Sequence, residues 1–331
     1  MNAPDVLVVD VARRDLLGGD TVHAELTLSS FADEAAASGE VRWELEVGGG
    51  AAATGSLPVH AWPRATAIPV GSLAIDVPDV DSTTEAWLRV TVVDDAGRTR
   101  ATDAIRLAIL PRAAATTAAP LRLNVIDPGN VWSLEQAVSR LGHRVVGRDA
   151  AELVITTELD DELLGHIEDA GMRALVLVRT RDAVRRAADL ARHVEVHLRR
   201  LPMAGAPGQR SPWEGDWVSS FCWLLPDVFP HVPTRNPLDF AFQEVLPDHV
   251  LTGYDPARHV EEVTGGMFVG WVHSPAALIW GFPQGRGRIK LTTLHLAPES
   301  GPVATALLEG LIQRSAAERP IRTDRTAPSA G

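Results

Sequence analysis

The chain has 331 residues, more than one ordinary hydrophobic core organises, so two domains are expected. Hydrophobic residues make up 45% and charged residues 22%, a balance typical of a folded globular protein and unlike that of a disordered chain. The formal net charge of −12, without any run of basic residues, argues against nucleic acid as a partner.

The sequence favours a reducing compartment. Cys222 is the sole cysteine, so an intrachain disulfide is impossible. The first residues, MNAPDVLVVDVARRD, lack the basic start and the long apolar run of a secretory signal. No segment is apolar for long enough to span a membrane. A cytoplasmic protein without a membrane partner is therefore predicted.

The first part of the chain has the pattern of antiparallel strands. Between Asp5 and Ile109, apolar residues recur at every second position in short runs separated by turn residues. Trp43 fits this alternation as a plug of the core, and the turn at 94–97 joins two of the runs. About seven such strands in roughly a hundred residues predict an immunoglobulin-like β-sandwich over residues 1–111.

A linker is expected next. The stretch PRAAATTAAP, from Pro111 to Pro120, has no periodicity and is bracketed by prolines, so it has little to bury. We place the domain boundary at residues 112–120 and expect this segment to be exposed.

After the linker the hydrophobic period changes, and strands alternate with helices. This order predicts a mostly parallel sheet covered on both faces, an α/β domain over residues 121–317. Ser133 is expected to cap its first helix, and a disordered tail is expected at 318–331. The expected strands are 121–126, 145–146, 153–155, 174–178 and three within 266–294, and the expected helices are 134–141, 160–170, 182–191 and 302–315.

Several phrases carry a family resemblance. The stretch GGMFVGWVHSPAALIWGFPQGRGRIKLTTLHL, with EVLPDHVLTGYD before it and GPVATALLEGLI after it, resembles the C-terminal region of bacterial glycoside hydrolase family 2 proteins of the β-galactosidase and β-glucuronidase type. GGDTVHAELTLSS, VRWELEV and LRVTVVDDAGRTRATDAIRLAIL are similar to the immunoglobulin-like segment that follows the catalytic barrel in those proteins. The resemblance runs from about Asp5 to Arg314.

The resemblance implies a supporting role. In that family the catalytic glutamates lie on a TIM barrel that precedes this region, so they have no counterparts here and no catalytic residue or cofactor is predicted. The implied function is that of a non-catalytic accessory subunit or module, whose partners are a catalytic glycosidase chain or a second copy of itself, with a carbohydrate as a possible ligand. A free-standing carbohydrate-binding or scaffold protein is an alternative.

The second domain also resembles the flavodoxin-like fold of class I glutamine amidotransferases. A working amidotransferase needs a cysteine on a tight strand-to-helix turn between glycines, and a His-x-Glu pair to activate it. Cys222, in SSFCWLL, has no flanking glycine, and His295 and Glu299 are four residues apart. Cys222 is therefore predicted to be a buried apolar residue. An independent hydrolase that uses Cys222 and His295 is the rival hypothesis.

Other polar groups have simpler interpretations. His193 and His197, with Glu195 between them, suggest a metal site only weakly, so no metal is predicted. Acidic residues gather where the second helix begins, which is what capping and the helix dipole favour; they are Glu158, Asp160, Asp161 and Glu162. The glycines of 284–288 fit a hairpin turn better than a phosphate loop.

Aromatic residues give the only candidate contact surface. The stretch 211–237 is rich in tryptophan and proline and is predicted to be one irregular loop at the carboxyl edge of the sheet. Flat indoles stack on sugar rings and carboxylates accept hydroxyl hydrogen bonds, so the loop suits carbohydrate or a partner protein. The candidate residues are Trp213, Glu214, Asp216, Trp217 and Trp223. Burial in the core or in a subunit interface is the favoured interpretation of these tryptophans as a group, because Trp271 and Trp280 lie on expected strands.

Overall fold

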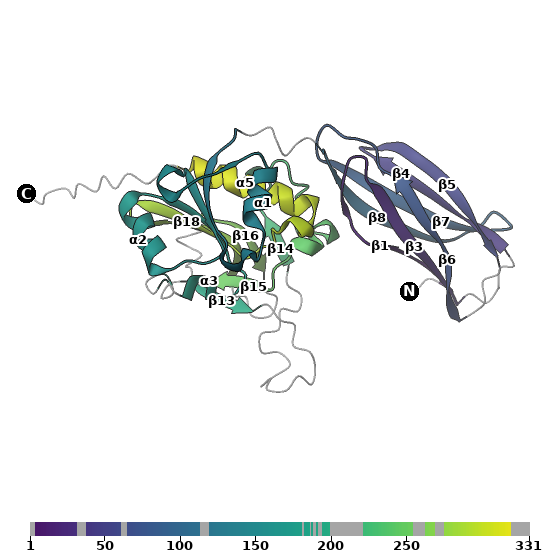
Figure 1. Cartoon of the computed structure of the whole chain (residues 1–331). Helices are drawn as coiled ribbons and strands as arrows, with labels where there is room; N and C mark the ends of the chain where they lie inside the picture. The colour runs from purple at the N-terminus through teal and green to yellow at the C-terminus, as the bar shows by residue number, and fades with distance from the viewer. Residues whose placement is uncertain are drawn as a thin grey trace, which may run out of the picture. The chain divides into compact units, whose positions relative to one another are not determined.

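The computed structural model describes residues 4–31, 38–60, 65–112, 119–180, 182–185, 187, 190, 194–198, 221–253, 262–268 and 275–318. It consists mostly of β-strands with a few helices, and it forms two compact units that divide near residue 114 (Figure 1). No helix within the described part is long and apolar enough to cross a membrane.

The first unit contains two sheets. A three-stranded sheet has the order β1-β3-β6, and a five-stranded sheet has the order β2-β8-β7-β4-β5. Neighbouring strands are antiparallel except β2 and β8, which are parallel. The strands are β1 (Asp5–Val11), β2 (Asp15–Leu17), β3 (Thr21–Ser30), β4 (Ser38–Val47), β5 (Gly50–His60), β6 (Thr66–Asp76), β7 (Thr84–Asp94) and β8 (Thr99–Leu110).

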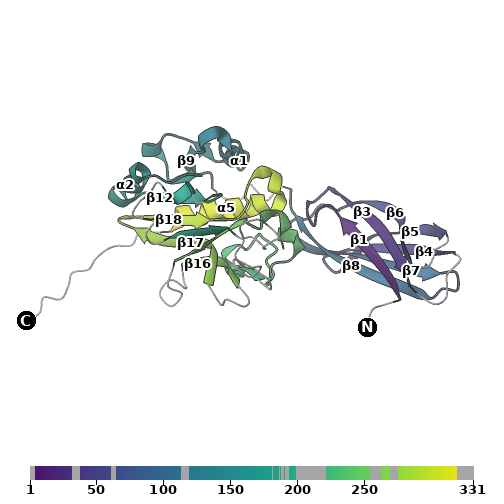
Figure 2. The ribbon, with the colours of Figure 1, turned by 90° about the horizontal axis from the view of Figure 1, so that it is seen from below.

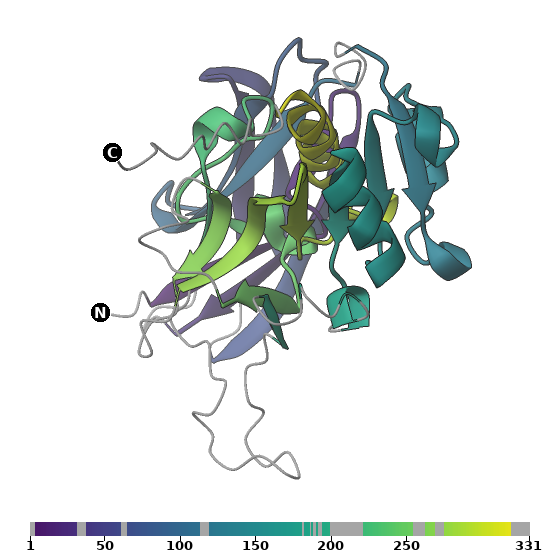
Figure 3. The ribbon, with the colours of Figure 1, turned by 90° about the vertical axis from the view of Figure 1, so that its left-hand side faces the viewer.

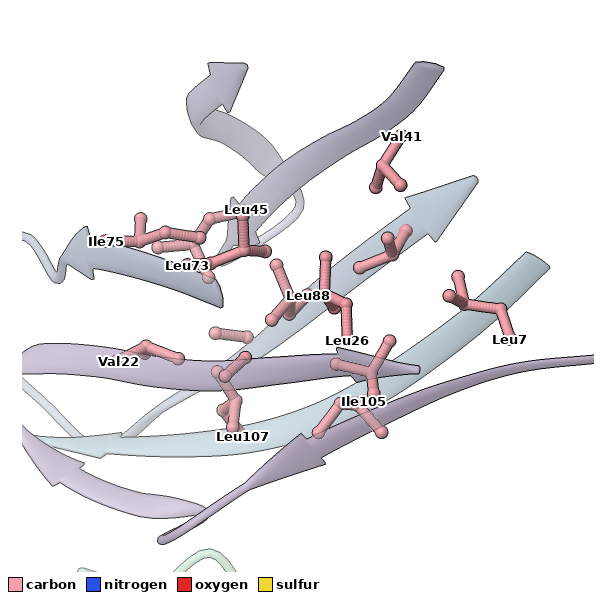
Figure 4. Close-up of a cluster of buried hydrophobic side chains, with 14 of the residues drawn as sticks. Leu7, Val22, Leu26, Val41, Leu45, Leu73, Ile75, Leu88, Ile105 and Leu107 are labelled. Atoms are coloured by element: carbon pink, nitrogen blue, oxygen red, sulfur yellow. The ribbon is translucent and has the colours of Figure 1, made fainter. Parts of the chain in front are cut away.

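Apolar side chains at alternate positions along these strands form the core. Leu26 of β3, Leu45 of β4 and Leu88 of β7 are buried in one cluster that draws on both sheets (Figure 4). Trp43 differs from the expected core plug, because it is half-buried and only borders this cluster. A Cβ at Gly55 would lie 2.4 Å from the Trp43 ring, so the indole lies against the backbone of β5.

Buried ion pairs join β1 to β8, which belong to different sheets. Arg100 Nε donates to Asp5 Oδ2 at 2.8 Å, and the Arg100 guanidinium also reaches Asp94 at 3.5 Å. Both carboxylates are almost fully buried, with 1% of each side chain exposed. Burial acts to raise the pKa of Asp94, but hydrogen bonds from Arg98 and Arg100 lower it overall. The stability that Asp94 contributes is therefore present at neutral pH and is lost as the pH falls through its lowered pKa.

We predict that Arg100→Met destabilises the first unit by roughly 3 kcal/mol, because it leaves two buried carboxylates without their shared cation. The matched control is Arg89→Met, since Arg89 pairs with Glu46 at 3.0 Å on the surface and should cost about 1 kcal/mol or less. Urea unfolding at neutral pH measures both changes. Equal losses for the two variants would contradict a structural role for the Arg100 network.

The second unit is built on one ten-stranded sheet. Its strands are β9 (Arg122–Ile126), β10 (Arg144–Val145), β11 (Leu153–Thr156), β12 (Arg173–Leu177), β13 (Glu195–Leu198), β14 (Phe221–Leu224), β15 (His249–Thr252), β16 (Val263–Phe268), β17 (Pro275–Gln284) and β18 (Gly287–Thr292). Its α-helices include α1 (Leu134–Arg140), α2 (Asp161–Ala170), α3 (Asp182–Arg185) and α5 (Pro302–Ala317), and 3-10 turns include η6 (Phe240–Val245) and η7 (Pro298–Ser300).

Half of this sheet is parallel. The order β10-β9-β11-β12-β18 is 2-1-3-4-5 when these parallel strands are numbered along the chain, which is the order of doubly wound flavodoxin-type sheets. The strands β13 to β17 are inserted before the last parallel strand and pair antiparallel. The expectation of a mostly parallel sheet is wrong for this insertion, because hairpin connections favour antiparallel neighbours (Figure 2).

Helices pack on the sheet through their apolar sides. In α2, Leu163, Leu164 and Ile167 join one core cluster with strand residues of β11, β12 and β18. Helix α5, yellow in Figure 3, is tied to the start of the unit by Glu309, whose carboxylate lies 2.8 Å from His143 Nε2. His143 Nδ1 accepts from the Leu121 N–H at 3.2 Å, so Nε2 is the donor to Glu309.

Candidate functional site

The carboxyl edge of the parallel strands contains the candidate site. In open α/β sheets, ligands bind beyond the carboxyl ends of the strands, where the strand order reverses. Here the reversal lies between β9 and β11. Asp127 directly follows β9, Thr157 follows β11, and His295 lies three residues after β18.

Asp127 organises the loop after β9. Its carboxylate accepts from the backbone N–H groups of Val131 at 3.1 Å, Trp132 at 3.0 Å and Leu134 at 3.3 Å. The Thr157 hydroxyl donates to the same carboxylate at 3.4 Å. These four donors use most of the acceptor capacity of one carboxylate, so Asp127 fixes the loop and is poorly placed to act as a base.

The same loop has an unusual backbone. Asn130 and Ser133 have φ values of 53° and 48°, in the left-handed region that side chains other than glycine rarely adopt. Ser133 precedes α1, but its side chain makes no capping hydrogen bond, so the expectation that it caps this helix is wrong. Asp127 bonds the first helical N–H instead, which lets Ser133 turn the chain into α1.

His295 is held between an indole and a carboxylate. The Trp132 ring meets it edge to face, with ring centroids 6.5 Å apart and an interplanar angle of 87°. Asp248, which precedes β15, places its Oδ2 3.5 Å from His295 Nε2. Trp132 is buried, whereas 31% of the His295 side chain is exposed. Because 74% of the Asp248 side chain is exposed, its contact with His295 is a surface ion pair at the sheet edge.

Cys222 does not lie with the turns that follow the parallel strands. It is buried on β14, in register with Met267 of β16, in the antiparallel part of the sheet. Its prediction as a buried apolar residue is confirmed. Glu299 lies on the exposed 3-10 turn η7, and the carboxylate found beside His295 is that of Asp248. Neither Cys222 nor Glu299 therefore occupies the position that the catalytic group of an amidotransferase requires.

The tryptophan-rich loop is only partly described. Trp213, Glu214, Asp216 and Trp217 lie outside the described residues, as does Trp271. Trp223 is on strand β14 and not in an irregular loop, so that expectation is wrong for this residue. Its half-buried indole borders the core cluster, and a Cβ at Gly266 would lie 2.6 Å from the ring. Trp280 is buried on β17 against Phe282, with ring centroids 4.8 Å apart, as expected of a core residue.

The remaining candidates have structural positions. His197 is on β13 while His193 lies outside the described residues, and within the described ranges no three His, Cys, Asp or Glu side chains gather as metal ligands. Asp160 caps α2 by accepting from the Leu163 N–H at 2.8 Å, which confirms the capping interpretation. The turn at 284–287 joins antiparallel β17 and β18, which confirms the hairpin.

Sequence reasoning missed Asp127 and Asp248. The phrase Asp127-Pro128-Gly129-Asn130 directly after a strand is a turn signal, in which an aspartate commonly binds the following backbone N–H groups. This turn signal is enough to identify Asp127 as the residue that binds the backbone N–H groups of the loop. Asp248 and His295 are 47 residues apart in the chain, and no local sequence signal connects them.

Comparisons with known proteins give partial structural likenesses. No family model matches the sequence, and no curated protein matches it. A β-glucuronidase of glycoside hydrolase family 2 shares 9% identity over 51% of this chain and 20% of its own, with a TM-score of 0.26. Bacteroides uniformis β-glucuronidase 2 shares 12% over 51% of this chain and 22% of its own, with a TM-score of 0.25.

The likenesses are not confined to glycosidases. The Pseudomonas fluorescens alkylpurine DNA glycosylase AlkC shares 14% identity over 32% of this chain and 30% of its own, with a TM-score of 0.25. This chain thus spans less than a third of each of these three proteins. The activity that is named for each of these three proteins is a property of that protein and is not assigned to this chain.

We predict that Asp127→Ala lowers the free energy of unfolding of the second unit by roughly 2 to 3 kcal/mol, because three backbone N–H groups lose a charged acceptor. Asp160→Ala is the graded control, since it removes a single capping bond worth about 1 kcal/mol. Denaturant unfolding followed by near-ultraviolet circular dichroism compares the two variants. A smaller loss for Asp127→Ala than for Asp160→Ala would show that the loop does not depend on this carboxylate.

Proposed function

We propose that this chain is a non-catalytic accessory module of a family 2-type glycoside hydrolase, which supplies an interface and part of a sugar-binding wall while catalysis takes place on another polypeptide. The order of the two units, a β-sandwich and then an α/β sheet, fits the region that follows the catalytic barrel in that family. An amidotransferase-like identity of the α/β unit is part of the proposal. The sequence phrases shared with the family are its starting point.

The observation that carries the proposal is where the reactive side chains lie. Cys222 is buried on an antiparallel strand, which removes it from the strand-to-helix turn that a nucleophile elbow requires. Asp127, the carboxylate nearest the reversal of strand order, is occupied by backbone N–H groups. An aspartate that fixes its own loop and a cysteine buried on an antiparallel strand favour a supporting role over the rival hydrolase.

We predict that the purified chain hydrolyses neither aryl glycosides nor glutamine. A family 2 glycosidase barrel that lacks these two domains should gain activity or thermal stability when the chain is added. Steady-state assays of the chain, the barrel and the mixture measure this.

Two results would overturn the proposal. Glutaminase activity of the chain alone that Cys222→Ala abolishes would establish the rival hydrolase. If the activity and the thermal stability of the barrel do not change when the chain is added, and analytical ultracentrifugation detects no complex, the accessory role is contradicted.

The second expectation concerns Trp217. If this indole faces a partner or a sugar, Trp217→Ala weakens that binding by roughly 2 kcal/mol or more while the melting temperature stays unchanged, as for interface hot spots. Trp223→Ala is the matched control, because Trp223 borders the core and its loss should lower the melting temperature. Lower stability of Trp217→Ala with unchanged binding would show that Trp217 is a core residue.

A further inference from the structure

Positive side chains gather at the amino edge of the parallel sheet, beneath the last turn of α5. Lys290 Nζ lies 2.5 Å from Glu318 Oε1, and Arg288 Nε lies 3.1 Å from Glu318 Oε2. Arg314, one helical turn before Glu318, places its Nε 3.6 Å from the same carboxylate. Three cations therefore share one carboxylate.

Two members of this group are largely buried, whereas 41% of the Arg314 side chain and 26% of the Glu318 side chain are exposed. Only 4% of the Lys290 side chain is exposed, and 18% of that of Arg288. Burial lowers the pKa of Lys290 most, Glu318 acts to raise it, and the neighbouring Arg314 and Arg288 lower it further. The charges thus interact with one another, and the cations exceed the single carboxylate by two unit charges.

A fourth cation, Arg173, lies next to the group, and its charge also acts on Glu152. The Cα of Arg173 on β12 is in direct register with that of Arg288 on β18, so the two side chains share one face of the sheet. Arg173 Nε and Arg314 Nε are buried without a hydrogen-bond partner among the described residues.

Ser315 provides an independent observation. It lies on α5, three residues before Glu318, whose N–H still donates to the Arg314 carbonyl at 3.1 Å as in a helix, so the two residues lie on the same side. Only 4% of this residue is exposed, and its Oγ has no hydrogen-bond partner in the described part of the chain. A helical serine in the interior usually bonds to the carbonyl four residues earlier, so a free buried hydroxyl requires another partner.

We propose that Arg173, Arg288, Lys290, Arg314 and Ser315 form a binding site for a small tetrahedral oxyanion of the phosphate or sulfate class, beside Glu318. Such an anion accepts several hydrogen bonds at once, and its negative charge offsets the excess of these four cations over the nearby carboxylates Glu318 and Glu152. Arginine is well suited to it, because the guanidinium presents a planar fork of donors. The site is at the edge of the sheet opposite the carboxyl ends, and it does not depend on the accessory role proposed above.

The test uses the full chain and inorganic phosphate. Thermal unfolding is measured in phosphate and in sodium chloride of equal ionic strength, and isothermal titration gives the dissociation constant. We expect a higher melting temperature in phosphate than in chloride, because a ligand that binds only the folded state stabilises it. The double variant Arg173→Gln, Ser315→Ala should bind about tenfold more weakly or worse, since one change removes a cation and the other removes a hydroxyl donor.

A matched control on α1 separates binding from general charge effects. Ser139→Ala with Arg140→Gln makes the same kinds of change at exposed positions and should keep the full response to phosphate. If the double variant at the site fails to fold, Ser315→Ala alone decides, because it removes one unpartnered hydroxyl. A wild-type chain that responds equally to phosphate and chloride, or site variants that keep full affinity, would overturn the proposal.

Discussion

The parallel pairing of β12 with β18 is the constraint on which the second unit depends. Arg288 N–H donates to the Met172 carbonyl at 3.1 Å as β18 begins, and a Cβ at Gly287 would lie 2.2 Å from that same oxygen. Any side chain at Gly287 would push the two strands apart, since a backbone carbonyl cannot move aside cheaply. The close approach aligns residues 173–177 with 288–292 and so completes the 2-1-3-4-5 order.

Both edges of the sheet follow from this pairing. Beyond its carboxyl end, β18 continues to His295, which meets Trp132 from the loop after β9. At its amino end, Arg288 and Lys290 come under α5 and bind Glu318. A shift of β18 by one residue would turn Lys290 to the opposite face of the sheet, because side chains alternate along a strand. The candidate site and the proposed anion site therefore depend on one register.

Much of the fold could be predicted because its signals are local. The alternation in the first unit identified its strands, and the turn at 94–97 correctly joined β7 to β8. Asp160 and Gly171 mark the start and the end of α2, as a capping aspartate and a left-handed glycine do. The sandwich core likewise follows from period-two burial. Each of these features is decided within about ten residues of chain.

The rest depends on contacts that no local pattern encodes. Hydrophobic runs in the insertion between β12 and β18 identify strands such as β16 and β17, but they do not specify their pairing partners or direction. Trp223 was assigned to a loop because prolines and tryptophans surround it, whereas pairing with β16 makes it part of a strand. Likewise Asp248 meets His295 only through the tertiary fold.

The two units balance buried charge in opposite ways. In the first, Arg100 lies between the carboxylates of Asp5 and Asp94, and Arg98 adds a second cation at Asp94, so opposite charges are matched. In the second, Lys290 and two arginines share the carboxylate of Glu318. Unmatched buried charge is costly, and a chain with a net charge of −12 has many acidic residues with which to neutralise it. Three cations around one carboxylate leave positive charge unmatched at this edge, and it is this excess that the proposed oxyanion would offset.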